Sequence, residues 1–140
     1  MILQQLAIGL GAIAATVAIH ATFMAVALAH VQRRPPRTET ALHKALFIVA
    51  VVMWFFLSIC IQCWGWAVLL RWLGALGDFE EALYFVTVSF TTVGYGDIVL
   101  GPDWRLLGAF AAVNGTIILG WTTALVFLAV QRAYLFDRTG

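Results

Sequence analysis

Three runs without a charged residue constrain the fold of this chain more than any other feature. They cover residues 1–32, 45–70 and 106–131. Each is longer than the roughly 20 residues that an apolar helix needs to cross the hydrocarbon core of a bilayer. Hydrophobic residues make up 63% of the chain and charged residues 11%, a composition typical of membrane proteins. The sequence therefore predicts an all-α membrane protein with three transmembrane helices.

A fourth apolar segment, residues 82–90, is too short to cross the membrane and is predicted to be a re-entrant helix. Asp78 is a suitable N-cap for it, and Glu80 and Glu81 fall in its first turn, where carboxylates favour the positive end of the helix dipole. These two glutamates have two compatible interpretations, which are simple capping and the attraction of cations.

Positive residues predict the orientation of the chain. Only Arg71 and Arg105 lie on one side of the membrane, whereas the other side has six: Arg33, Arg34, Arg37, Lys44, Arg132 and Arg138. The side with six is expected to be cytoplasmic, so the amino terminus is external and the carboxyl terminus internal. An outer aromatic belt is expected from Trp64, Trp66, Trp72 and Trp104.

Residues 32–41 are predicted to be a cytoplasmic linker. Pro35 and Pro36 should break the first helix, and Thr40 is a suitable N-cap for the second. A voltage sensor needs arginines at every third position inside a spanning helix. The arginines here stand beside prolines in a loop, so a role in orientation is favoured over voltage sensing.

Residues 83–97 read LYFVTVSFTTVGYGD. An ordinary strand sends successive carbonyls to opposite sides, but Gly94 and Gly96 can take positive φ without steric cost. A backbone of this kind can turn the carbonyls of residues 92–95 to one side. A row of such oxygens can replace the hydration shell of an ion in a narrow pore.

This segment resembles the pore helix and selectivity filter of the potassium channel family. A chance match to residues 91–97 would occur in on the order of one in ten million chains of this size. The resemblance implies a homotetramer in which potassium binds to Thr92, Val93, Gly94 and Tyr95, the Thr92 hydroxyl adds an inner ring, and Gly96 completes the filter. One chain cannot enclose an ion path with a single such segment, so oligomerisation also follows from the residues.

The resemblance extends to bacterial two-helix channels over roughly residues 42–131. It implies a pore domain at 42–132, with an outer helix at 42–72, a pore helix at 79–91, the filter at 92–96 and an inner helix at 104–132. Residues 1–31 form an extra transmembrane helix without a counterpart in those channels, and residues 133–140 a short cytoplasmic tail.

Residues of the predicted inner helix recur at helical spacing and are expected to line a cavity and a gate: Gly115, Thr116, Leu119, Gly120, Thr123 and Phe127. Gly115 is the hinge candidate. A glycine there has a second interpretation of equal weight, which is close packing against a neighbour.

The surroundings of the filter depart from the family pattern. Val88 stands where some bacterial members have a glutamate, and Tyr84 and Phe85 stand where tryptophans are frequent. We therefore expect Asp97 to accept a hydrogen bond from the Tyr84 hydroxyl, and the Tyr95 hydroxyl to bond Ser89. The alternative is that Tyr84 only packs and Asp97 is solvated.

The first helix is too long for a signal peptide and no Lys or Arg precedes it, so it is expected to remain in the mature protein. Small residues recur along it (Gly11, Ala15, Ala21, Ala25 and Ala29), and such a face packs closely against another helix. His20, near its middle, is either functional or a neutral residue hydrogen-bonded to another helix, and the second is favoured. Cys60 and Cys63 are expected to be apolar core residues and not a redox or metal site.

The predicted function is passive potassium conduction in the plasma membrane, with a bacterial inner membrane as the expected location. The chain is not expected to be an enzyme, to need a cofactor beyond the permeating potassium ions, or to bind nucleic acid. Two alternatives remain. The first is a weakly selective monovalent cation channel, which would usually lose Tyr95 or Gly96; the second is a non-conducting subunit of a hetero-oligomeric channel.

Overall fold

Four α-helices make up the computed structural model, which describes residues 2–33 and 40–134. They are α1 (Ile2–Arg33), α2 (Ala41–Trp72), α3 (Phe79–Phe90) and α4 (Arg105–Tyr134). Three of them, α1, α2 and α4, are long and apolar enough to cross a membrane, whereas α3 has only 12 residues. The predicted all-helical fold, with three spans and a short fourth helix, is confirmed. Pro35, Pro36 and residues 135–140 of the predicted tail lie outside the described residues.

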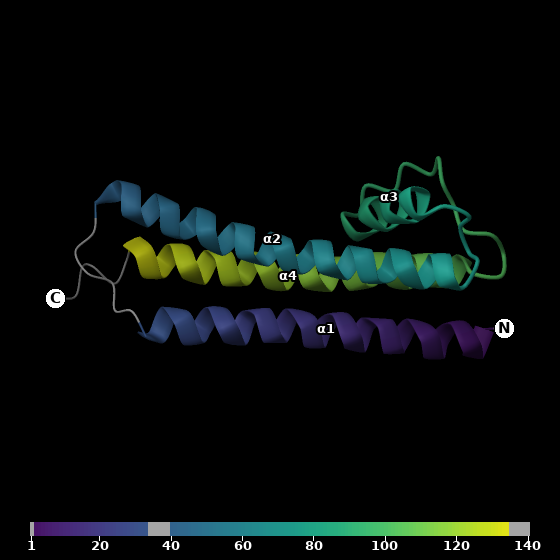
Figure 1. The fold of residues 1–140 in the computed structure, drawn as a ribbon, viewed down its shortest axis with the longest axis horizontal. Helices are drawn as coiled ribbons and strands as arrows, with labels where there is room; N and C mark the ends of the chain where they lie inside the picture. Colours follow the sequence, from purple (N-terminus) through teal and green to yellow (C-terminus); the bar gives the residue numbers. More distant parts are fainter. Residues whose placement is uncertain (1, 34–39, 135–140) are drawn as a thin grey trace.

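The three long helices run side by side, and α3 lies along one end of α2 and α4 (Figure 1). α1 and α4 run in the same direction, with α2 opposite to both (Figure 1). Both α1 and α3 contact α2 and α4, but α1 and α3 do not contact each other within the described chain. α1 is therefore an addition to a unit formed by α2, α3 and α4.

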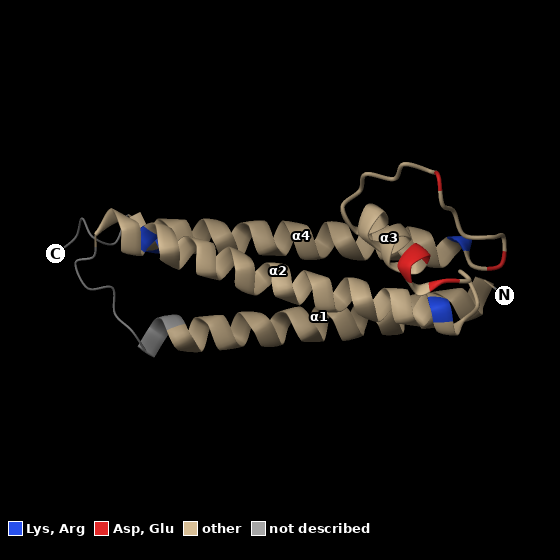
Figure 2. Ribbon diagram, turned by 45° about the horizontal axis from the view of Figure 1, so that its top comes forward, with Lys and Arg blue, Asp and Glu red and all other residues tan. Residues whose placement is uncertain are grey.

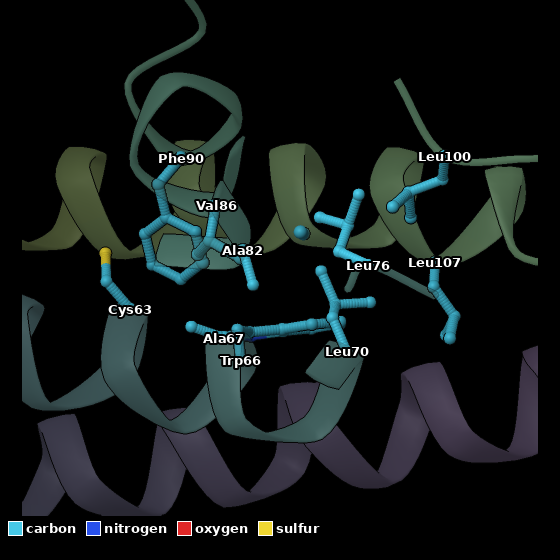
Figure 3. Packing of buried hydrophobic residues seen from close by; sticks show 11 residues of the cluster. Cys63, Trp66, Ala67, Leu70, Leu76, Ala82, Val86, Phe90, Leu100 and Leu107 are labelled. Atoms are coloured by element: carbon cyan, nitrogen blue, oxygen red, sulfur yellow. The ribbon is translucent and has the colours of Figure 1, made fainter. Parts of the chain in front are cut away.

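A hydrophobic core holds α3 on the long helices (Figure 3). Ala82, Val86 and Phe90 lie four residues apart, so they form one face of α3, and all three are buried. This face packs on buried residues of α2 and α4: Cys63, Trp66, Ala67, Leu70, Leu107 and Ala111. Because α3 packs on both α2 and α4, the segment after Phe90 begins at a defined position.

Two residues of α2 bear on predictions made from the sequence. Cys63 is buried in the core, as expected, whereas Cys60 is half-buried and lies outside the core; both are free thiols. Trp66 is only 1% exposed, so its assignment to an outer aromatic belt was wrong. It lies on the face of α2 that α3 covers, whereas Trp64 and Trp72 are exposed.

The starts of α2 and α3 differ in their capping. The Asp78 carboxylate accepts a hydrogen bond from the backbone N–H of Glu80 at 2.9 Å, so the predicted cap of α3 is confirmed. Thr40 occupies the N-cap position of α2, but its hydroxyl bonds the ring of His43 at 2.7 Å and caps no backbone N–H. The imidazole of His43 competes with the helix for this hydroxyl.

The charged residues of the described chain lie at the two ends of the bundle (Figure 2). Five acidic residues, Asp78, Glu80, Glu81, Asp97 and Asp103, lie in or beside α3 and the loop that leads to α4. Lys44 lies at the opposite end, with its ammonium 5.6 Å from the centre of the Tyr134 ring. The middle of each described span therefore carries no charge, in agreement with the absence of a voltage-sensor pattern.

Candidate functional site

The predicted filter segment starts directly after α3, and the backbone N–H groups of its first three residues bond carbonyls at the end of that helix. Thr92 N–H donates to the Ser89 carbonyl at 3.0 Å, and the N–H groups of Val93 and Gly94 donate to the Val88 carbonyl at 3.1 and 3.3 Å. No described donor bonds a carbonyl of residues 92–96. Since each residue has one backbone donor and one acceptor, these carbonyls remain available to solvent or to a group from outside the chain.

Positive φ angles alternate along this segment. They occur at Thr92 (61°), Gly94 (54°) and Gly96 (79°), and not at Val93 or Tyr95. The expectation of positive φ at both glycines is confirmed. Positive φ at every second residue departs from the geometry of an ordinary strand, in which φ is negative throughout and successive carbonyls point to opposite sides.

Positive φ at Thr92 was missed by the sequence reasoning. A non-glycine residue in this region is uncommon, and nothing in a threonine side chain signals it. The spacing was the available sign, because Thr92 precedes Gly94 by the same two residues that separate Gly94 from Gly96.

A hydrogen bond joins α3 to the far end of the segment. The Tyr84 hydroxyl donates to Asp97 Oδ2 at 2.7 Å, which is the contact expected from the sequence. The other carboxylate oxygen, Oδ1, accepts the backbone N–H of Ile98 at 3.0 Å. The Tyr84 hydroxyl lowers the pKa of the Asp97 carboxyl, and the same bond raises the pKa of Tyr84. The segment is thus attached to α3 at both of its ends.

A cavity of about 190 Å³ separates the segment from α3. Its lining includes Tyr84, Phe85, Val88, Ser89, Gly94 and Asp97. The expected hydrogen bond between the Tyr95 hydroxyl and Ser89 is not made within the described chain. The Tyr95 side chain is 73% exposed, so its hydroxyl is accessible to solvent or to a partner from outside this chain.

Tyr84→Phe is expected to loosen the segment without unfolding the protein. The substitution keeps the ring and removes the hydroxyl that lowers the pKa of Asp97. Because that pKa is depressed in the folded state, the bond contributes above the ordinary pKa of aspartate and is lost as the pH falls through the depressed value. We expect a higher Asp97 pKa by carboxyl NMR and a roughly 3- to 10-fold faster hydrogen exchange of the backbone amides of residues 92–97.

Tyr134→Phe is the matched control, since it removes a hydroxyl from the opposite end of the bundle and keeps the ring that faces Lys44. An unchanged Asp97 titration in Tyr84→Phe would show that the bond does not support the segment.

One face of α4 is exposed along most of its length. Of the predicted cavity and gate residues, Thr116, Gly120, Thr123 and Phe127 are exposed and Leu119 is half-buried. The hydroxyls of Thr116 and Thr123 donate to the carbonyls of Ala112 and Leu119 at 3.0 and 2.9 Å. These threonines therefore leave no unsatisfied donor on the face, which suits an aqueous path or a second chain.

Gly115 does not share this exposed face. It is buried, and a Cβ built on it would overlap backbone atoms of Phe90 at the end of α3. α4 also continues as one helix through this position. Of the two interpretations of Gly115, the structure therefore favours close packing. Gly120 has no atom within 4 Å of a Cβ position.

α1 packs through a different face from the one expected. Of the five small residues, Gly11, Ala15, Ala25 and Ala29 are exposed and Ala21 is half-buried, so most of this face makes no contact within the described chain. Among residues 2–30 of α1, whose burial the structure describes, the buried positions are Gln5, Gly9, Thr16 and His20. Three of these four are polar and have partners on α2 or α4, which removes them from contact with lipid.

His20 is fully buried and bonds two other helices. Its Nδ1 lies 3.2 Å from the Ser58 hydroxyl on α2, and its Nε2 lies 3.4 Å from the Thr122 hydroxyl on α4. The favoured interpretation of His20, a residue hydrogen-bonded to a neighbouring helix, agrees with this geometry.

Comparison with known families gives one match. The family model described as "Ion channel" matches residues 46–132, which is more than half of the chain. Searches of curated proteins and of solved structures found no match. The matched region begins in α2, contains all of α3 and the segment 92–96, and ends in α4.

Proposed function

Because the chain belongs to the ion channel family, we propose that it is the pore subunit of a potassium-selective channel. The observation that carries this proposal is the backbone of residues 92–96. Its carbonyls accept no hydrogen bond from the described chain, and positive φ recurs at every second residue. A potassium ion that leaves water requires oxygens in place of its hydration shell, and rings of backbone carbonyls supply them.

The short helix α3 adds an electrostatic contribution. Its amino end carries Asp78, Glu80 and Glu81, and its carboxyl end leads into the segment. The negative end of a helix dipole favours a cation near the last turn. At the outer side the five acidic residues named above oppose Arg71 and Arg105, a balance of −5 + 2 = −3 per chain. The mouth of the pore is therefore expected to attract cations.

The working unit is a homotetramer in this proposal. One chain contributes one segment, and irregular backbone at membrane depth must be buried in protein or line an aqueous path. The exposed face of α4 and the exposed side chains of Val93 and Tyr95 provide surface for neighbouring copies. The four-fold symmetry itself comes from the resemblance to potassium channels.

The proposed orientation places α3 and the acidic residues outside the cell, and Lys44 and Arg132 in the cytoplasm, according to the distribution of positive charge. The membrane is a plasma membrane, and the bacterial inner membrane is the proposed location.

Ion flux in liposomes tests the proposal. We expect the permeability for potassium and rubidium to exceed that for sodium and lithium by more than about tenfold. A tenfold ratio corresponds to a free-energy difference of ~1.4 kcal/mol. Reversal potentials under bi-ionic conditions measure this ratio. Comparable sodium permeability would favour the weakly selective cation channel. No flux from a purified, assembled protein would favour a non-conducting subunit.

A further inference from the structure

α1 contacts α4 through polar side chains at three levels. Gln5 Oε1 accepts the backbone N–H of Leu106 at 3.1 Å. The Thr16 hydroxyl accepts a hydrogen bond from the Asn114 amide nitrogen at 2.8 Å, and its one proton is within reach of the Ile13 carbonyl at 2.8 Å and of Asn114 Oδ1 at 3.0 Å. His20 reaches the Thr122 hydroxyl at 3.4 Å. Because the two helices run in the same direction, these contacts hold one register over several turns (Figure 1).

The contact of His20 requires one tautomer. The Thr122 hydroxyl donates its only proton to the Ile118 carbonyl at 2.8 Å, so it can only accept from His20 Nε2–H. His20 Nδ1 is then an acceptor, and it faces two donors of α2, the hydroxyl of Ser58 at 3.2 Å and the amide of Gln62 at 3.3 Å. A neutral His20 therefore joins α1 to both helices.

Two of the three contacts involve parts of α4 that adjoin residues on either side of the filter segment, residues 92–96. Residues 97–104 lead from the filter to α4, and Leu106 lies in the first turn of α4, where N–H groups lack a partner within the helix. Gln5 supplies that partner. At the other end, Asn114 precedes Gly115, and Gly115 packs against the backbone of Phe90, two residues before Thr92.

We propose that α1 positions the filter by fixing α4. Gln5 and Thr16 are the positioning residues, and they act through the first turn of α4 and through Asn114. This inference rests on the proposed function, since it assigns the filter role to residues 92–96. A shift of α4 at Asn114 changes the approach of Gly115 to the backbone of Phe90, which is so close that a Cβ on Gly115 would overlap it. The N–H bonds of Thr92, Val93 and Gly94 to the end of α3 should then weaken.

Hydrogen exchange of residues 91–97, measured by mass spectrometry on the full chain in lipid nanodiscs, tests whether α1 positions the filter. Thr16→Val removes the hydroxyl and keeps the shape of the side chain. We expect exchange of this peptide to become about three- to tenfold faster, as for the loss of an interhelical hydrogen bond in a membrane protein. Thr16→Ser restores the hydroxyl and should restore the wild-type rate.

Thr22→Val is the matched control, because Thr22 is an exposed residue of the same helix whose hydroxyl bonds only the Ala18 carbonyl at 2.8 Å. Equal exchange rates in Thr16→Val and Thr22→Val would overturn the proposal. If Thr16→Val does not fold, Gln5→Met provides the same test from the other end of the filter. Exchange is measured without ion flux, so the potassium selectivity of the wild-type protein is decided separately.

Discussion

Gly96→Ala is expected to abolish potassium selectivity. Gly96 has a φ of 79°, a region that L-residues with a Cβ avoid at a cost of roughly 1–2 kcal/mol. No atom lies within 4 Å of the position that a Cβ would take, so the cost is conformational and not a clash with the described chain. In the proposed tetramer four copies incur this cost around one ion path. Bi-ionic reversal potentials should then move toward equal permeability for potassium and sodium, or the oligomer should not form.

A D-alanine at position 96, introduced by chemical ligation, separates conformation from bulk. A D-residue takes positive φ without strain and carries the same methyl group. Recovery of selectivity with D-alanine, and not with L-alanine, is the expected result. Wild-type ion preference with L-alanine would refute the assignment of residues 92–96 as the filter.

The helices could be predicted from the sequence because their signals are local. The charge-free runs 45–70 and 106–131 come within four residues of the observed ends of α2 (Ala41–Trp72) and α4 (Arg105–Tyr134). α3 was recognisable because Asp78 caps it and because Thr91 begins a polar run. The contact of Tyr84 with Asp97 could also be predicted. Val88 stands where some bacterial potassium channels have a glutamate, so Asp97 lacks that neighbour and the Tyr84 hydroxyl can bond it.

The packing of α1 could not be predicted in the same way. α1 is apolar on almost every face, so hydrophobic periodicity does not distinguish its buried side. The buried side is decided by pairs far apart in the sequence, Thr16 with Asn114 and His20 with Thr122. Small residues such as Gly11 and Ala15 indicate a face that permits close approach, but they do not say whether a helix of the same chain uses it.

Gly115 and Gly120 lie five residues apart on α4 and are expected to respond in opposite ways to the same substitution. At Gly115 a methyl group would overlap the backbone of Phe90, and the nearest atoms include the Phe90 carbonyl oxygen and Cα. A flexible side chain could move aside, but this backbone is held by α3 and its core. Overpacking of this kind costs about 1–3 kcal/mol in each chain. Gly115→Ala should therefore lower the thermal stability of the purified protein and disturb residues 92–96.

Gly120→Ala is the matched control for the size of the added group. Its Cβ meets no atom within 4 Å, and alanine is preferred to glycine in a helix by about 1 kcal/mol. We expect equal or higher thermal stability, measured by fluorescence-detected size exclusion after heating. If α4 bends at Gly120, this variant should also slow opening in single-channel records. Wild-type stability of Gly115→Ala would contradict the close packing of Gly115 against the backbone of Phe90.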